Sequence, residues 1–226
     1  MSFTPRLTVV LAVLALASGV RASEEHAAGG AAAAAQQALT ELKEGNARFV
    51  AGRAGHPHEN HGRVEEVAKG QHPRAIVLGC SDSRVPPEVV FDEGIGDLFV
   101  VRVAGNVSEP ATLASVEYAA EHLKVPLIVV LGHERCGAVK ATAEAKGEVP
   151  GNIGKLVQEL QPPVEAARKH PGKRGLVDDA VHVNVVYVAD QLQIESPVLR
   201  EMVEKGEVKI VTGVYGIETG KVEWGE

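Results

Sequence analysis

The sequence has little of what nucleic-acid-binding proteins need. Acidic residues outnumber basic ones by 30 to 23, so the chain has no excess of positive charge for a phosphate backbone. Only 4% of its residues are aromatic, which leaves no platform on which bases could stack. We therefore expect no nucleic-acid partner. No internal repeat is visible either.

Cysteine is almost absent, since the chain has only Cys80 and Cys136. Together with His133, these cysteines would give three zinc ligands. A closed structural zinc site would need a fourth Cys or His, and none stands near these three residues in the sequence. A disulfide between the two cysteines is the simplest alternative in an exported protein. However, a disulfide has no need of Asp82 and Arg84 beside one cysteine, or of His133 three residues before the other.

A long apolar segment near the N-terminus is also missing. The apolar run at residues 7–17 is too short to span a bilayer comfortably. Arg6 precedes this run, and residues 20–22 lead from it into an acidic stretch, which is the layout of a secretory signal peptide. We expect residues 1–22 to be a cleaved signal peptide, so that the mature protein is periplasmic or secreted and bound to no membrane. An uncleaved N-terminal anchor is the alternative.

About 200 residues remain after residue 22, enough for one well-cored domain. Residues 23–37 are rich in Ala and Gly, and we expect a flexible or weakly helical leader there. Residues 38–226 are expected to form a single α/β domain that opens with a helical arm, interrupted at Gly45-Asn46. The apolar face of this arm consists of Leu39, Leu42, Phe49 and Val50.

Four apolar segments are predicted strands: residues 75–78, 98–101, 127–131 and 208–215. The first three are rich in β-branched residues and do not alternate with polar ones, which is typical of strands buried on both faces of a parallel sheet. Helical segments separate or follow them, one after Pro110 and two more at residues 152–170 and 178–205. This alternation predicts an open, mainly parallel α/β sheet in the order 2-1-3-4, with room for an extra edge strand and with helices on its faces.

Two short polar segments follow the predicted strands. Cys80 comes two residues after the last apolar residue of the first strand, and His133 comes two after that of the third. In an open parallel sheet the ligand crevice lies beyond the carboxyl ends of the strands, where the strand order reverses. Cys136 follows His133 by one helical turn. Thiolate and imidazole suit tetrahedral zinc, and a catalytic zinc keeps three protein ligands, so we predict Zn²⁺ at Cys80, His133 and Cys136.

These segments, with others along the chain, closely resemble the β-class carbonic anhydrases. The resemblance covers most of the mature chain, and it is most specific in the central blocks. The matching segments are residues 44–49, 79–88, 96–106, 116–119, 129–139 and 214–220.

The resemblance implies reversible hydration of carbon dioxide to bicarbonate and a proton, by attack of a zinc-bound hydroxide. It implies that Cys80, His133 and Cys136 hold the zinc. Asp82 and Arg84 match the catalytic dyad of the family, in which the arginine keeps the carboxylate away from the metal. In a closed state of some members, the residue that matches Asp82 becomes the fourth ligand.

The resemblance also implies a substrate pocket and a homodimer or higher homo-oligomer. Gln71 matches a glutamine that hydrogen-bonds substrate, often across the subunit boundary. Phe99 and Tyr118 match residues that line the apolar carbon dioxide pocket, Ala104 stands where a larger Val is common, and Gly137 belongs to the same substrate-binding set. The helical arm at residues 39–50 matches the helix that wraps over the partner subunit.

Two other functions stay open on the sequence alone. The same scaffold and metal site could hydrolyse carbonyl sulfide or carbon disulfide with a different pocket. The chain could also be a zinc-binding or redox module without catalytic activity, in which Cys80 and Cys136 are oxidised to each other.

Overall fold

The computed structural model describes residues 8–225, and their side chains from residue 29 onward. The predicted signal peptide therefore lies partly outside the described residues and wholly outside the described side chains. In chain order the elements are α1 (Thr8–Val50), α2 (His61–Val67), β1 (Ala75–Gly79), α3 (Pro87–Val90), β2 (Leu98–Arg102), the 3₁₀ turn η1 (Ala104–Asn106), α4 (Pro110–Glu121), β3 (Leu127–His133), α5 (Gly137–Glu144), α6 (Gly151–Lys169), α7 (Leu176–Glu195), α8 (Pro197–Glu204), β4 (Lys209–Tyr215) and β5 (Val222–Trp224).

The five strands form one sheet in the order β2-β1-β3-β4-β5. The strands β1 to β4 pair in parallel, whereas the short β5 pairs antiparallel with β4. All residues of β1 and β3 are buried, as their uninterrupted apolar sequences predict. The predicted fold class and strand order are confirmed, and β5 is the extra edge strand.

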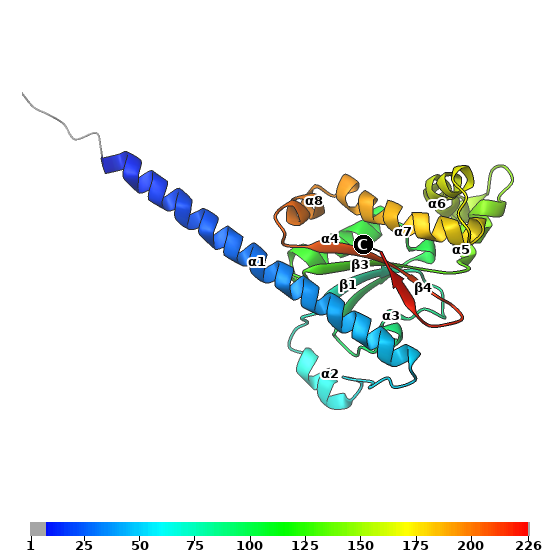
Figure 1. Cartoon of the computed structure of the whole chain (residues 1–226), viewed down its shortest axis with the longest axis horizontal. Coiled ribbons are helices and arrows are strands. Elements are labelled where there is room, and N and C mark those ends of the chain that lie inside the picture. Colours follow the sequence, from blue (N-terminus) through cyan, green and yellow to red (C-terminus); the bar gives the residue numbers. More distant parts are fainter. Residues whose placement is uncertain (1–7, 226) are drawn as a thin grey trace, which may run out of the picture.

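Helices cover both faces of the sheet, and alternate strand residues supply the two cores. Ile76 and Ile128 belong to the core shared with α4, α6, α7 and α8. Val77 and Val129 face the other way, toward a core that includes Leu42 of α1. Figure 1 shows α1 on one side of the sheet and α7 and α8 on the other. The polar segments lie at the carboxyl ends of the central strands β1 and β3.

Helix α1 runs without a break through Gly45-Asn46, so the predicted interruption is wrong. Glycine is required there because a Cβ at Gly45 would lie 1.8 Å from the carbonyl oxygen of Phe91. The buried Asn46 side chain donates to the carbonyl of Gly220 and accepts from the backbone N–H of Val222. Both residues are thus docking contacts between α1 and the body, and neither ends the helix.

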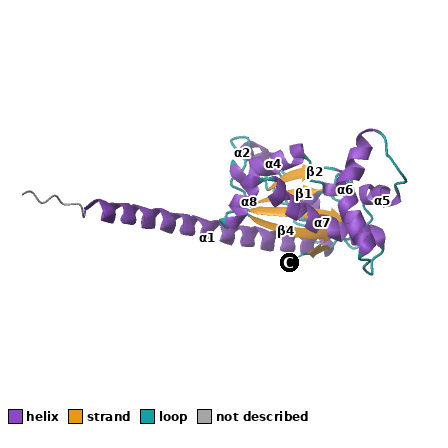
Figure 2. Ribbon diagram, turned by 90° about the horizontal axis from the view of Figure 1, so that it is seen from above, coloured by secondary structure: helices purple, strands orange, loops and turns teal. Residues whose placement is uncertain are grey.

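The arm packs on its own chain. Ala35, Leu39 and Leu42 are buried against the sheet, so the arm at residues 39–50 covers the protein's own core. Residues 23–37, expected to be a flexible or weakly helical leader, belong to α1, which extends well beyond the body (Figures 1 and 2). In the part of the chain that the structure describes, no helix combines the length and apolar character that crossing a membrane requires.

The long helix predicted at residues 178–205 is two helices. Ser196 has extended backbone angles, and its side chain accepts a hydrogen bond from the backbone N–H of Leu199, which caps α8. Pro197 follows as the first residue of α8 and has no N–H to continue α7. The chain therefore turns between Glu195 and Pro197.

Candidate metal centre

The three predicted metal ligands meet at the carboxyl end of the sheet. Cys80 is the first residue after β1, His133 is the last residue of the neighbouring strand β3, and Cys136 caps the start of α5. All three are buried, and their ligand atoms lie within 4.8 Å of one another. Both cysteines are free thiols, so the disulfide alternative is not what the structure has.

The chemistry of the donor set suits a tetrahedral metal ion. Nδ1 of His133 lies 2.9 Å from the carbonyl oxygen of Glu134 and donates to it, which fixes the tautomer and leaves Nε2 with a free lone pair. This Nε2 is buried and has no hydrogen-bond partner within the described part of the chain. One imidazole nitrogen and two sulfur atoms are a donor set that zinc prefers, with a fourth position open.

The two thiols shift each other's pKa. A hydrogen bond from Cys136 lowers the pKa of Cys80 well below its ordinary value, and it raises the pKa of Cys136. The backbone N–H of Gly105 also donates to Cys80 Sγ at 3.3 Å, which stabilises the thiolate further. One thiolate is therefore favoured before any metal binds.

Asp82 and Arg84 form a tight pair beside these ligands. Arg84 Nε donates to Asp82 Oδ1 at 2.9 Å, and Nη2 donates to Oδ2 at 2.7 Å. Asp82 Oδ2 is also 3.8 Å from His133 Nε2, so the carboxylate lies next to the atom that would ligate the metal. The hydrogen bonds from Arg84 hold the pKa of Asp82 well below its usual range. Asp82 is thus ionised at neutral pH and is bound to Arg84.

Arg102 holds the loop that carries Cys80 and Asp82. It is the last residue of β2 and pairs with Gly79 at the end of β1. Its Nε donates to the carbonyl oxygen of Cys80 at 2.9 Å, and its Nη2 donates to that of Asp82 at 2.6 Å. These two contacts were not predicted from the sequence, because backbone carbonyls leave no signal in residue types.

The remaining predicted site residues fall into two groups. Ala104 and Gly137 are close in sequence to the centre, since Ala104 precedes Gly105 and Gly137 follows Cys136. Gln71 precedes β1, whereas the metal ligands follow the strands, so one chain places Gln71 at the opposite end of the sheet.

Phe99 and Tyr118 contact each other, with ring centroids 6.2 Å apart. Phe99 pairs with Ile76 near the start of β1, and Tyr118 is 47% exposed. A single chain therefore brings the ligands and the Asp82–Arg84 pair together, but it does not bring Gln71 or the Phe99–Tyr118 pair to them.

Comparison with known proteins agrees with this geometry. A family model described as carbonic anhydrase matches residues 75–222, a region that contains all three ligands and the Asp82–Arg84 pair. The carbonic anhydrase of Mycolicibacterium smegmatis is 46% identical over 185 residues, which span 80% of this chain and 89% of that protein.

Solved structures of similar sequence have the same fold. The β-carbonic anhydrase CcaA matches with a TM-score of 0.66 and 29% identity, over 83% of this chain and 95% of that one. A tetrameric β-carbonic anhydrase of Sordaria macrospora matches with a TM-score of 0.64 and 27% identity, over 71% of this chain and 84% of that one. By sequence, fold and arrangement of its polar centre, the chain belongs to the β-class carbonic anhydrase family.

Proposed function

We propose that this carbonic anhydrase is a zinc enzyme that reversibly converts carbon dioxide and water to bicarbonate and a proton. The observation that carries the proposal is the buried set of Cys80, His133 and Cys136, with the carboxylate of Asp82 held beside it by Arg84. The family supplies the reaction, and these residues supply the groups that the reaction needs.

The three ligands would hold zinc and leave its fourth position open. Zinc, when bound, would supply a Lewis acid that makes water at that position easier to deprotonate, although less so than with three neutral histidines, because two thiolates offset its charge.

Asp82 accepts a hydrogen bond from the attacking water and so orients it toward carbon dioxide. Arg84 keeps Asp82 ionised and holds its carboxylate in place beside the ligand cluster, because its guanidinium binds both carboxylate oxygens.

A second copy of the chain would complete the substrate pocket. Gln71, Phe99 and Tyr118 lie away from the ligands of their own chain, while β2 is an outer strand of the sheet with only half-buried apolar residues. The Sordaria relatives are tetrameric, which supports an oligomer here. An apolar wall with one amide donor suits carbon dioxide on entry and bicarbonate on exit.

The test measures zinc content and carbon dioxide hydration in the same preparations. Wild-type protein should contain one zinc per chain and hydrate carbon dioxide. Cys80→Ala, His133→Ala and Cys136→Ala should each lose tight zinc binding and hydration together, because three ligands leave no redundancy. The exposed His56, whose side chain is 65% accessible, provides a control, and His56→Ala should keep both properties.

Retention of stoichiometric zinc and of hydration in Cys136→Ala would overturn the ligand assignment. Zinc-loaded wild-type protein without hydration activity would overturn the reaction while leaving the metal centre in place.

A further inference from the structure

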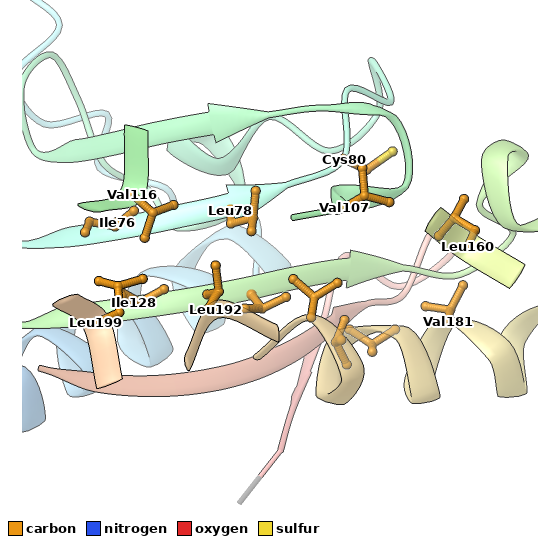
Figure 3. Packing of buried hydrophobic residues seen from close by; sticks show 14 of the residues in the cluster. Ile76, Leu78, Cys80, Val107, Val116, Ile128, Leu160, Val181, Leu192 and Leu199 are labelled. Carbon is orange, nitrogen blue, oxygen red and sulfur yellow. The ribbon is translucent and has the colours of Figure 1, made fainter. Parts of the chain in front are cut away.

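Gly105 lies against the first metal ligand in a position that only glycine can occupy. Its N–H donates to Cys80 Sγ, and its φ of +71° lies in the left-handed region. A Cβ there would be 2.9 Å from Cδ1 of Leu160 on α6 and 3.3 Å from Cβ of Ala138 on α5. Figure 3 shows Leu160 beyond the end of β1 that carries Cys80. The neighbouring helices thus limit where this N–H can be.

A side chain from α7 holds the other end of the same residue. Nδ2 of Asn184 donates to the carbonyl oxygen of Gly105 at 2.9 Å, and Asn184 is only 1% exposed. Helix α7 comes this close because Gly132 of β3 has no side chain. A Cβ there would lie 2.7 Å from Cγ1 of Val185 and 3.2 Å from Cγ1 of Val181. Gly105 is therefore bonded to α7 through its carbonyl and to Cys80 through its N–H.

Stability alone does not account for an amide at this position. The surrounding face of α7 is apolar, with Val181, Val185 and Val188 all buried. The Oδ1 atom of Asn184 is buried as well and finds no hydrogen-bond partner among residues 29–225. Burying an amide that is only half satisfied is unfavourable compared with an apolar side chain of the same size. The one bond that Asn184 does make goes to the residue that contacts the ligand.

We propose that Asn184 is a positioning residue for the metal centre, which holds Gly105 so that its N–H stays on the sulfur of Cys80. An N–H···S bond withdraws electron density from a thiolate, so Asn184 sets how strongly Cys80 donates to the metal. Groups that hydrogen-bond to metal ligands tune both affinity and electronic properties, and Asn184 holds such a group, the N–H of Gly105, in place. The inference rests on the proposed metal centre and deepens it.

The test replaces zinc by Co²⁺, whose thiolate-to-metal charge-transfer band reports electron donation by sulfur. In Asn184→Leu, which has a similar volume and no donor, the band should move to longer wavelength because the sulfur becomes the richer donor. Affinity for zinc should fall about 10- to 100-fold, since the ligand is less well placed. Asn184→Ser, which is too short to reach Gly105, should give the same shifts and provides a second variant if Leu does not fold.

Asn46→Leu is the matched control. Asn46 is also buried, and it also hydrogen-bonds backbone groups, those of Val90, Gly220 and Val222. None of these three residues hydrogen-bonds to a metal ligand within the described part of the chain. This variant should lower the midpoint of thermal unfolding and leave the charge-transfer band unchanged.

An unchanged band and unchanged zinc affinity in both Asn184 variants would overturn the inference. The same band shift in Asn46→Leu would overturn it too, because the effect would then be a general loosening of the fold. If wild-type protein bound neither cobalt nor zinc, the metal centre itself would be wrong, and with it the proposed function.

Discussion

Substitution of Asp82 or Arg84 should affect the hydration rate without affecting zinc binding. Neither belongs to the ligand set, because the carboxylate of Asp82 is bound to Arg84. We expect Asp82→Asn and Arg84→Ala to keep one zinc per chain and to lose about 10²- to 10⁴-fold in the rate of carbon dioxide hydration, the usual contribution of a positioned acid or base. Zinc analysis and stopped-flow hydration at saturating substrate measure the two quantities.

The pH dependence of the hydration rate in wild-type protein should reflect ionisation of the attacking water and not of Asp82. Because Arg84 holds the pKa of Asp82 well below its usual range, Asp82 stays ionised at all pH values near neutrality. The rate should nevertheless rise as the pH increases above neutrality, since two thiolates disfavour ionisation of the attacking water. A rate that is flat down to mildly acid pH, or wild-type turnover in Asp82→Asn, would contradict this account.

Glu93 should make the stability of the fold depend on pH. Its side chain is 5% exposed, and its nearest cation is Arg74, with Nε at 3.8 Å. Burial raises the pKa of Glu93 to about 7, and the attraction of Arg74 offsets this only in part. The folded state thus binds this proton more tightly than the unfolded chain does. The stabilisation is complete below the ordinary pKa of the carboxyl group and is lost as the pH rises toward 7.

We therefore expect Glu93→Gln to exceed wild-type protein in free energy of unfolding by roughly 1 to 3 kcal/mol at pH 8, and to match it near pH 4. Arg74 keeps its bond to Glu41 at 2.7 Å in this variant, so the guanidinium is not left without a partner. Urea unfolding at the two pH values measures the difference. An equal difference at both would mean that the proton on Glu93 is not its cause.

Among single residues, the sequence predicted those whose side-chain type alone indicates metal binding or charge pairing. Cys80, His133 and Cys136 are thiol and imidazole donors at or just beyond the ends of strands, and Asp82 and Arg84 are charges beside a donor. Asn184 and Glu93 gave no such signal. The role of Asn184 depends on a contact with Gly105, 79 positions away. The raised pKa of Glu93 comes from burial, and a charged residue is normally expected to be exposed.

The edge strand β2 is where we expect a second copy of the chain to bind, and a substitution in β2 tests this. Within the described chain it pairs only with β1, and its residues Leu98 to Val101 are half-buried. We expect Val100→Lys to place a charge at this edge, to produce species of lower mass, and to reduce hydration because Gln71 of one chain no longer reaches the metal of the other. Light scattering coupled to gel filtration, with parallel hydration assays, measures both effects.

Ile153→Lys is the control for this prediction, because Ile153 is an apolar residue of α6 that is 64% exposed. It should leave both mass and activity as in wild-type protein. Val100→Lys protein with unchanged mass would place the interface elsewhere. A fully active monomer would show that Gln71 is not required from a second chain.

At the element scale, the apolar runs predicted all four long strands to within two residues at either end. The expected burial on both faces is confirmed for β1 and β3, whereas it is wrong for β2 in a single chain, because β2 lies at the edge of the sheet and its apolar residues are only half-buried. Helix α6 was predicted equally well. The division between α7 and α8 was readable from Ser196-Pro197, which is a cap followed by a residue without an N–H. The continuity of α1 through Gly45 was not readable, because it depends on the approach of Phe91 from a distant segment.

For the whole molecule, we propose export guided by residues 1–22. Expressed from the full gene in a Gram-negative host, the protein should appear in the periplasmic fraction with an N-terminus near Ser23, because the segment before it has the layout of a signal peptide. Cell fractionation and N-terminal sequencing measure this. A variant that begins at Ser23 after an initiating Met is the control and should stay in the cytoplasm. Full-length protein confined to the cytoplasm would refute export.

The chain has two cysteines, and both belong to the candidate metal centre. No cysteine is therefore left to form a stabilising disulfide, and the fold depends on noncovalent contacts. An oxidant that joined Cys80 to Cys136 would remove two of the three proposed ligands at once. A thiol reagent added to the unfolded, metal-free chain would find two groups per molecule, and any shortfall in that number would count centres already lost to oxidation. The number of reactive thiols per molecule would thus measure how many molecules keep both of the proposed cysteine ligands.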